Sequence, residues 1–406
     1  MSEASRRTFL KASVLTTAVS AGRVLGANDR IRIGVIGTGG RGRYLIKELS
    51  KIGGIDIVAV CDIYDVRRQQ AAQEAGTPPA EQYVDYKQVI ERKDVDAVIV
   101  ATPDHWHATV SVDALNAGKD VYCEKPMVHY PKDGQAIVKA VRANNRVLQV
   151  GMQGRLLPQF IEAKQLYIDS GVIGKVGLAR TWYTSNQGYI QVAPAGMERK
   201  PDGLDWDRWL GPGPKVPWNP EIYFSPYKWL NYDGGMIMGI AIHVLDSAHH
   251  WLGLRKPKWA FTGGGTYFYK DGRDTPDVVT IILEYPQNVT VTFDAEALTA
   301  PGVKTTAGVE LRGSGGRLWA ERYIQDIGYE YTPNTKFSKA LPAKAIGGHQ
   351  SAEPLLRNWL DCIRTRQRTV ANEVEAYYST MACFMANQSY RTQSKVVWDS
   401  VWDLPA

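Results

Sequence analysis

The sequence predicts an α/β domain built on a doubly wound parallel sheet, followed by an α+β domain with a predominantly antiparallel sheet. Two observations predict this order. Over the first 150 residues, short apolar runs rich in β-branched residues alternate with helix-like segments, which is typical of parallel sheets. From residue 259 onward, polar and apolar residues alternate, as in 278–285 and 289–293, which indicates strands with one buried face.

The first domain is expected over residues 28–150, and its elements follow from these patterns. Apolar runs bounded by glycine mark the strands, and apolar residues at helical spacing mark the helices. The predicted strands are 31–37, 55–61, 94–101, 121–123 and 147–150, and the predicted helices are 44–52, 107–117 and 132–144.

The second domain, expected over residues 151–406, begins where this alternation stops. Residues 182–229 are rich in Trp, Tyr, Pro and Gly, and we expect them to form long ordered loops. Amphipathic helices are expected at 353–364 and 374–392. The four cysteines are scattered without a Cys-x-x-Cys pair, which predicts single buried thiols rather than disulfides.

The charge and composition narrow the class of protein. With 44% apolar and 22% charged residues, the chain has the balance of a soluble globular protein. About half of the net charge of +6 lies in the first 27 residues, and the rest forms no basic stripe, which argues against nucleic-acid binding. No segment has the roughly 18 uninterrupted apolar residues that a membrane span needs.

The first 27 residues resemble a twin-arginine (Tat) export signal. Arg6 and Arg7 precede a weakly apolar run over 12–25. The resemblance implies that the Tat machinery exports the folded protein to the periplasm or out of the cell. A frayed basic N-terminus is the alternative.

A glycine-rich loop between the first predicted strand and helix indicates a dinucleotide site. It has the G-x-G-x-x-G spacing, in which the glycines permit a tight turn, close approach of the pyrophosphate and close packing of helix on strand. Asp62 ends the second strand, where a carboxylate binds ribose hydroxyls and repels a 2′-phosphate, so we expect NAD. Arg67 and Arg68 lie close enough to leave NADP open. The loop residues are Gly37, Thr38, Gly39, Gly40, Arg41 and Gly42.

Two further motifs give the chain a specific resemblance. Thr-Pro-Asp-His-Trp-His at 102–107 and Cys-Glu-Lys-Pro at 123–126 each follow a predicted strand. With the glycine loop, they are similar to motifs of the Gfo/Idh/MocA family, named for glucose–fructose oxidoreductase and inositol dehydrogenase. The resemblance implies a Rossmann domain followed by an open-faced sheet that covers the nicotinamide. It also implies NAD(P)-dependent oxidation of a CH–OH group in a sugar, polyol or glycoside.

The resemblance also implies roles for single residues. Lys125 contacts the substrate oxygen, where hydride transfer needs a base for the hydroxyl proton and a cation beside the developing alkoxide. A purely structural Lys125 is the alternative. The residues expected to line the cofactor are Thr102, Pro103, His105, His107, Glu124 and Lys125.

A second family motif lies on a predicted helix over 234–246 and departs from the usual pattern. His243 and Asp246 match, but Gly239 replaces the acid that usually shares proton transfer with the histidine. We therefore expect His243 to be the main proton-transfer residue there, titrating near neutrality. Asp233, in the preceding loop, is a candidate replacement for this acid, but the sequence does not show which way its side chain points. His243, Asp246 and His250 also have a spacing compatible with a metal, but we expect none.

The substrate side is less well defined by the sequence. Polar candidates for sugar hydroxyls are Arg155, Asn186, Gln187, His243 and Asp246. The aromatic residues of 182–229 either form a platform for pyranose rings or pin the loops or a subunit interface, and both interpretations stay open.

Three functions compete at this stage. The first is a sugar or polyol dehydrogenase, and the second is a redox-neutral glycosidase or lyase in which bound NAD oxidises the sugar transiently. The third is an inactive carbohydrate-binding protein, suggested by Gly239 alone. Scarcity of free dinucleotide outside the cytoplasm favours a tightly held cofactor, and we also expect a homo-oligomer.

Overall fold

The computed structural model describes residues 30–78, 81–185, 193–296, 305–322, 328–336 and 351–405. The expected Tat signal over 1–27 lies outside the described residues. In the described part of the chain, no helix combines the length and apolar character needed to cross a membrane.

The first half of the chain forms a six-stranded parallel sheet in the order β3-β2-β1-β4-β5-β6. The chain reverses its direction of winding between the neighbouring strands β1 and β4, and ligands of such sheets bind at this reversal. This confirms the predicted doubly wound domain. The strands are β1 (Ile31–Ile36), β2 (Ile55–Cys61), β3 (Gln82–Tyr83), β4 (Ala97–Val100), β5 (Asp120–Cys123) and β6 (Leu148–Val150).

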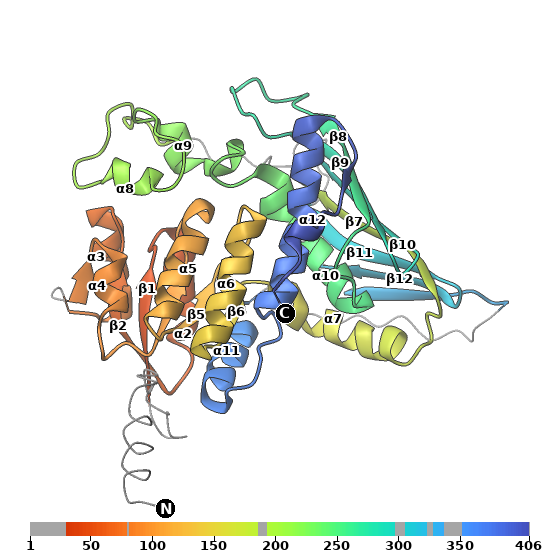
Figure 1. Ribbon diagram of the computed structural model, residues 1–406, viewed down its shortest axis with the longest axis horizontal. Helices are drawn as coiled ribbons and strands as arrows, with labels where there is room; N and C mark the ends of the chain where they lie inside the picture. The colour runs from red at the N-terminus through yellow and green to blue at the C-terminus, as the bar shows by residue number, and fades with distance from the viewer. Residues whose placement is uncertain are drawn as a thin grey trace, which may run out of the picture.

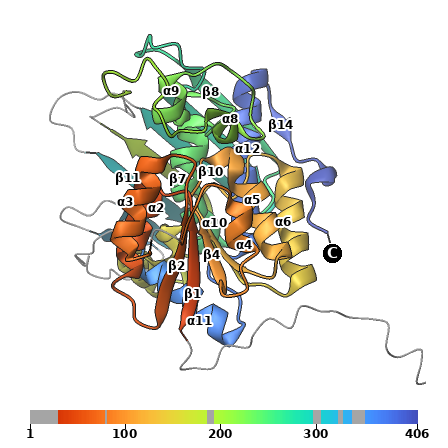
Figure 2. The ribbon, with the colours of Figure 1, turned by 90° about the vertical axis from the view of Figure 1, so that its left-hand side faces the viewer.

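Five helices pack on this sheet and bury its apolar runs (Figures 1 and 2). The first begins at Gly40, four residues earlier than predicted, because the last glycines of the loop already belong to its first turn. The helices are α2 (Gly40–Leu49), α3 (Asp65–Ala75), α4 (Tyr86–Ile90), α5 (His107–Asn116) and α6 (Pro131–Asn144).

The second sheet has eight strands in the order β13-β12-β11-β7-β10-β9-β8-β14. Among the described strands of this second sheet, only β7 and β10 pair in parallel, so the prediction of a predominantly antiparallel sheet is confirmed. Burial alternates along β10, as the period-two pattern predicts. The strands are β7 (Val176–Thr184), β8 (Trp259–Gly265), β9 (Val278–Tyr285), β10 (Val289–Glu296), β11 (Thr306–Gly313), β12 (Gly316–Glu321), β13 (Tyr329–Pro333) and β14 (Val396–Val397).

Helices α10 (Ile242–Leu252) and α12 (Glu373–Thr392) lie between the two sheets and cover one face of the second (Figure 1). Helix α7 (Pro158–Ala163) packs against strands β12 and β13 of that sheet. Helix α11 (Glu353–Thr365) returns to the first domain, where Trp359 is fully buried and its ring centroid lies 5.8 Å from that of Tyr122. The end of the chain therefore completes the core of its beginning.

The aromatic segment that was expected to be loops contains more regular structure. Its start belongs to β7, and it includes the short helices α8 (Trp206–Leu210) and α9 (Pro220–Phe224). We call residues 204–232 the roof, because these helices lie over the ends of the first sheet's strands (Figure 1). The roof has a small core of its own: Leu204, Trp206, Trp209, Leu210, Ile222, Tyr223 and Tyr232. The four cysteines are buried free thiols, as predicted.

Candidate active site

The glycine loop has the backbone that a dinucleotide site requires. Gly37 has φ +84°, and a Cβ there would lie 2.5 Å from the Thr102 amide nitrogen. A Cβ on Gly42 would lie 2.0 Å from the Gly37 carbonyl oxygen, so the helix can approach the loop only without a side chain. A Cβ on Gly40 would meet nothing within 4 Å, because this side of the loop is open.

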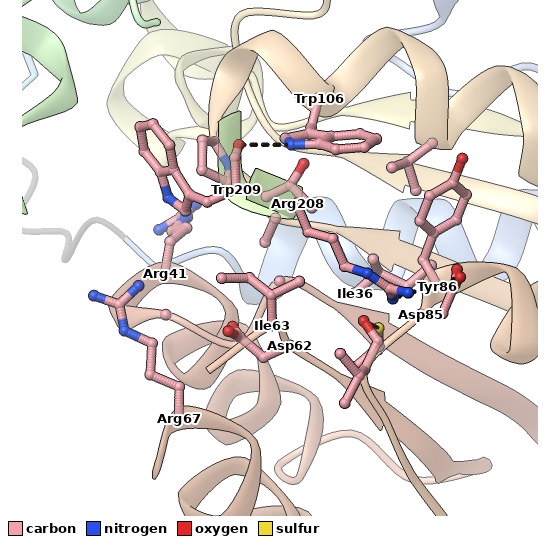
Figure 3. A pocket seen from close by; sticks show the side chains of 18 of the residues that line it. Ile36, Arg41, Asp62, Ile63, Arg67, Asp85, Tyr86, Trp106, Arg208 and Trp209 are labelled. Atoms are coloured by element: carbon pink, nitrogen blue, oxygen red, sulfur yellow. Dashed lines mark hydrogen bonds and ion pairs between the residues drawn. The ribbon is translucent and has the colours of Figure 1, made fainter. Parts of the chain in front are cut away.

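A cavity of about 680 Å³ lies in front of the loop (Figure 3). The end of α2 that faces it carries unpaired backbone N–H groups, which attract phosphate. The volume is in the usual range for small-molecule and cofactor sites. The cavity and the glycine geometry therefore fit NAD. Lining residues include Gly37, Gly39, Gly40, Arg41, Asp62, Ile63, Arg67, Thr102, Pro103, Trp106, Trp209 and Tyr223.

Asp62 is buried at the end of β2 with its carboxylate fixed toward the loop. It accepts hydrogen bonds from the Thr38 amide at 2.7 Å and the Tyr64 amide at 2.9 Å. Arg67 lines the same cavity and lies over the Tyr223 ring, 4.6 Å from its centroid. Arg68 instead donates to the Asp62 carbonyl oxygen and pairs with Asp65. Of the two arginines, Arg67 is thus the one placed to meet a ligand.

The roof is held by the motif over 102–107, and this corrects one expectation. His105 was predicted to line the cofactor, but its Nε2 lies 2.8 Å from the Trp209 carbonyl oxygen. Trp106 Nε1 donates to the same oxygen at 2.9 Å. Burial lowers the pKa of His105 to about 4, so the ring is neutral near pH 7. His105 fixes the roof over the cavity.

His107 is a second correction. Its Nδ1 lies 2.7 Å from the Pro126 carbonyl oxygen and its Nε2 lies 3.0 Å from that of Thr102. The buried ring therefore joins the two loops that follow β4 and β5, and it is not among the residues that line the cavity. Its role is to position Thr102 and the Glu124–Lys125–Pro126 motif.

The aromatic residues of the roof pack on one another. Trp206 stacks on Trp209 with ring centroids 4.9 Å apart, and Tyr223 lies against both Trp209 and Trp218. Trp182 lies elsewhere, stacked on Trp319 in the second sheet. Their packing supports the interpretation that these rings pin the segment, rather than form an open sugar platform.

Glu124 and Lys125 directly follow β5, next to the segment after β4 that carries Thr102. Val100 pairs with Cys123, so Thr102 and Lys125 each lie two residues beyond this pair on neighbouring strands. Glu124 forms an ion pair with Arg41 of the glycine loop at 2.8 Å. Lys125 Nζ donates to the Gly239 carbonyl oxygen at 3.0 Å. The structure therefore places Lys125 between the cofactor domain and the second domain.

His243 is partly buried near this point, and its buried Nδ1 lacks a hydrogen-bond partner among the described residues. Burial lowers the pKa of His243 well below its usual value, and the nearby cations Arg322, Lys125 and Arg41 lower it further. This corrects the expectation that it titrates near neutrality. The imidazole is therefore neutral, and it can donate one hydrogen bond and accept another.

Arg155 and Asp246, which were predicted to bind substrate, form a buried ion pair with each other. Arg155 Nη2 lies 2.7 Å from Asp246 Oδ1, and the two side chains are only 2% and 1% exposed. Asp246 also accepts a hydrogen bond from Ser379 at 2.7 Å. The two charged groups therefore neutralise each other inside the fold. The same bonds occupy the Asp246 carboxylate that a metal with His243 and His250 would need. Asn186 and Gln187 lie outside the described residues.

A carboxyl pair beside Lys125 was only half anticipated. Asp233 lies in the loop before the π-helical turn Ile237–Ala241 and is hydrogen-bonded to Asp104. Burial is the main cause that raises the pKa of both carboxyls, and Lys125 opposes it. From the sequence, Asp233 was a candidate acid, but Asp104 had no predicted role. Asp104 lies in the motif over 102–107, and nothing in the sequence connects it to a residue 129 positions away.

Comparisons with known proteins agree with this architecture. The family profile described as "Oxidoreductase family, NAD-binding Rossmann fold" matches residues 31–152, and "GFO/IDH/MocA C-terminal domain" matches 215–319. Together they match more than half of the chain.

Three relatives illustrate the similarity. Inositol 2-dehydrogenase of Salmonella typhimurium is 37% identical over 147 residues, which are 36% of this chain and 43% of that protein. The scyllo-inositol 2-dehydrogenase (NAD(+)) of Bacillus subtilis is 24% identical over 91% of this chain and 97% of its own length. The solved structure of levoglucosan dehydrogenase in complex with NADH has a TM-score of 0.70 at 18% identity, covering 91% of this chain and 99% of that one.

Proposed function

Because the chain belongs to the Gfo/Idh/MocA family of oxidoreductases, we propose that it oxidises a CH–OH group of a sugar, polyol or glycoside with NAD. The observation that carries this proposal is the position of Lys125. Its amine is hydrogen-bonded to the second domain at Gly239, and Lys125 follows β5 next to the segment after β4 that carries Thr102, a residue lining the cavity. A substrate hydroxyl placed between the two domains would therefore meet an amine that can take its proton and, once protonated, stabilise the developing alkoxide.

The chain supplies the remaining requirements from separate elements. The glycine loop and α2 would hold the pyrophosphate of NAD, and Asp62 would hold a ribose. NAD, when bound, supplies the acceptor for a hydride from the substrate carbon. Lys125 orients the hydroxyl and takes its proton, while neutral His243 offers a hydrogen bond. The Arg41–Glu124 ion pair fixes the loop that carries Lys125.

A redox-neutral reaction is the second candidate, and the roof favours it. Hydrogen bonds from Trp106 and His105 to the Trp209 carbonyl group hold the roof over the cavity. Such a cover slows release of a bound dinucleotide. An enzyme that keeps its cofactor can oxidise a glycoside, eliminate the aglycone and reduce the ring again without net NADH.

We also propose export by the twin-arginine pathway, which the arginine pair at Arg6 and Arg7 supports. Replacing both arginines by lysine should keep the protein in the cytoplasm. Export that is unchanged in this variant would contradict the proposal.

The experiment that tests the function follows two products at once. Purified protein is incubated with NAD and a panel of inositols, levoglucosan and aryl glycosides, and both NADH and free aglycone are measured. Net NADH supports the dehydrogenase, and aglycone without net NADH supports the redox-neutral reaction. Binding of a panel member without either product would contradict both and leave an inactive binding protein.

A further inference from the structure

Two carboxyl groups interact with each other and with the charge of Lys125. Asp104 begins a short helical turn after β4, and Asp233 reaches it from the second domain. One oxygen of each, Asp104 Oδ2 and Asp233 Oδ1, is buried and accepts no hydrogen bond from the described residues. A buried carboxyl oxygen without a hydrogen-bond partner lowers the stability of the fold. The arrangement therefore points to a functional role for the pair.

The backbone of the second domain aims Asp233 at this position. Gly234 and Gly235, which follow it, have φ values of +88° and +68°, a region that residues with a Cβ rarely adopt. The Gly234 carbonyl oxygen accepts a hydrogen bond from Asn387 on α12 at 3.2 Å. The loop is therefore fixed, and it ends at the turn whose Gly239 carbonyl group binds Lys125.

The surroundings of the pair disfavour ionisation of both carboxyls. Two interacting buried carboxyls cannot easily both ionise, because two negative charges side by side repel each other. The charged groups that face the pair are Lys125, which favours its ionised form, and Glu124, which is already paired with Arg41. His129 Nε2 lies 4.0 Å from Asp104 Oδ2, and burial lowers the pKa of His129 to about 3, so it is neutral.

We propose that the Asp104–Asp233 pair accepts protons from Lys125 and so replaces the acid that is missing at Gly239. This inference rests on the proposed function. In the first step, an N–H bond of Lys125 breaks and an O–H bond forms on the singly charged pair. In the second step, the freed amine takes the proton of the substrate hydroxyl as the substrate carbon is oxidised. The net result is transfer of the hydroxyl proton to the pair. The two aspartates do not touch the substrate in this scheme; they act on it through Lys125, by taking the proton that Lys125 gives up.

The first test measures turnover of the NAD-loaded full chain on the panel member that reacts fastest. We expect Asp233→Asn to lower kcat roughly 10²-fold near neutral pH, the usual scale of acid–base assistance. KM and NAD affinity should not change, and the rate should recover as pH rises, because hydroxide then removes the proton. The double variant Asp104→Asn/Asp233→Asn should be no slower than the slower single variant.

A matched control separates this role from support of the loop. Asp274 is another carboxyl near the same loop, where its Oδ1 accepts a hydrogen bond from the Leu230 amide at 2.7 Å. We expect Asp274→Asn to leave the pH profile unchanged. If Asp233→Asn loses no more activity than Asp274→Asn at every pH, the pair does not accept protons and the proposal is wrong.

The second test needs no turnover and separates this proposal from the proposed function. The infrared spectrum of the wild type near neutral pH should show a protonated carboxyl band that both Asp104→Asn and Asp233→Asn remove. Lys125→Met should raise the pH at which this band disappears, because the cation that favours the ionised pair is gone. Absence of the band, or a titration that Lys125→Met does not move, overturns the inference. A wild type that shows both effects but reduces no NAD contradicts only the proposed function.

Discussion

Lys125 Nζ lies 3.0 Å from the carbonyl oxygen of Gly239 and donates a hydrogen bond to it. This bond joins the end of β5 in the first domain to the π-helical turn Ile237–Ala241 of the second. At this position the chain offers only a backbone carbonyl group, because Gly239 has no side chain. A carbonyl oxygen accepts a hydrogen bond but cannot store a proton. Under the proposed function, the proton that leaves a substrate needs another acceptor.

Lys125→Ala tests the central side chain. We expect turnover to fall at least about 10²-fold, because the variant loses a cation whose contribution grows as the alkoxide develops, a term of about 3 kcal/mol. Affinity for NAD, measured by titration, should be unchanged. The exposed Lys132→Ala is the control for a generic loss of positive charge. Near-normal turnover in Lys125→Ala would show that this lysine is structural.

His243→Asn tests the neutral imidazole. Burial holds the pKa of His243 well below its usual value, so the folded enzyme keeps it uncharged near neutral pH. We expect the variant to lower kcat while the shape of the pH profile stays the same. The unfolded chain protonates this histidine below about pH 6.5, so its contribution to stability weakens as pH falls. A histidine-like limb in the wild type that vanishes in the variant would refute this assignment.

Asp62→Asn tests the choice of dinucleotide. The amide keeps an oxygen for the Thr38 N–H group but removes the charge that opposes a 2′-phosphate. We expect NAD to bind roughly 10-fold more weakly and NADP more tightly than in the wild type, with Arg67 available to the phosphate. Calorimetric titration of both dinucleotides onto stripped protein measures this. Tighter binding of NADP than NAD by the wild type would contradict the predicted role of Asp62.

Arg155→Met tests the buried ion pair. The substitution leaves the Asp246 carboxylate without its partner, and we expect a loss of about 3–5 kcal/mol in the free energy of unfolding. Arg155 lowers the pKa of Asp246 in the fold, so the pair stabilises the protein above about pH 4 and less as pH falls through the lowered value. The deficit of the variant should therefore shrink in acid.

Urea denaturation at several pH values measures this deficit. Arg255→Met is the matched control, because Arg255 is 55% exposed in its ion pair with Glu375 and should contribute at most about 1 kcal/mol. A cost for Arg155→Met no larger than the cost for Arg255→Met would show that the pair is dispensable.

The sequence predicted elements and motif positions well, because these depend on local patterns. The strand 278–285 and the helix 374–392 match the structure to within one residue. The glycine loop and Asp62 were also assigned from spacing, since a β–α unit fixes where its own residues lie. The antiparallel sheet followed from its period-two burial.

Side-chain partners could not be read in the same way, because they come from distant segments. His105 meets Trp209, 104 residues away, and Arg155 meets Asp246, 91 residues away. A motif shows that these residues lie near the site, but not which way they turn. The direction of Asp233 depends on two left-handed glycines and on Asn387 of the last helix, so only the folded chain brings it to Asp104.

Transfer of a deuterium label tests the account most directly. The NAD-loaded protein is mixed with myo-inositol, scyllo-inositol and levoglucosan deuterated at their carbinol carbons, and the nicotinamide is analysed by mass spectrometry. The account predicts that deuterium from one of these substrates enters the nicotinamide in the wild type, about 10²-fold more slowly in Lys125→Ala. This holds for the dehydrogenase and for the redox-neutral reaction alike. A substrate that binds but never transfers its label would contradict the account.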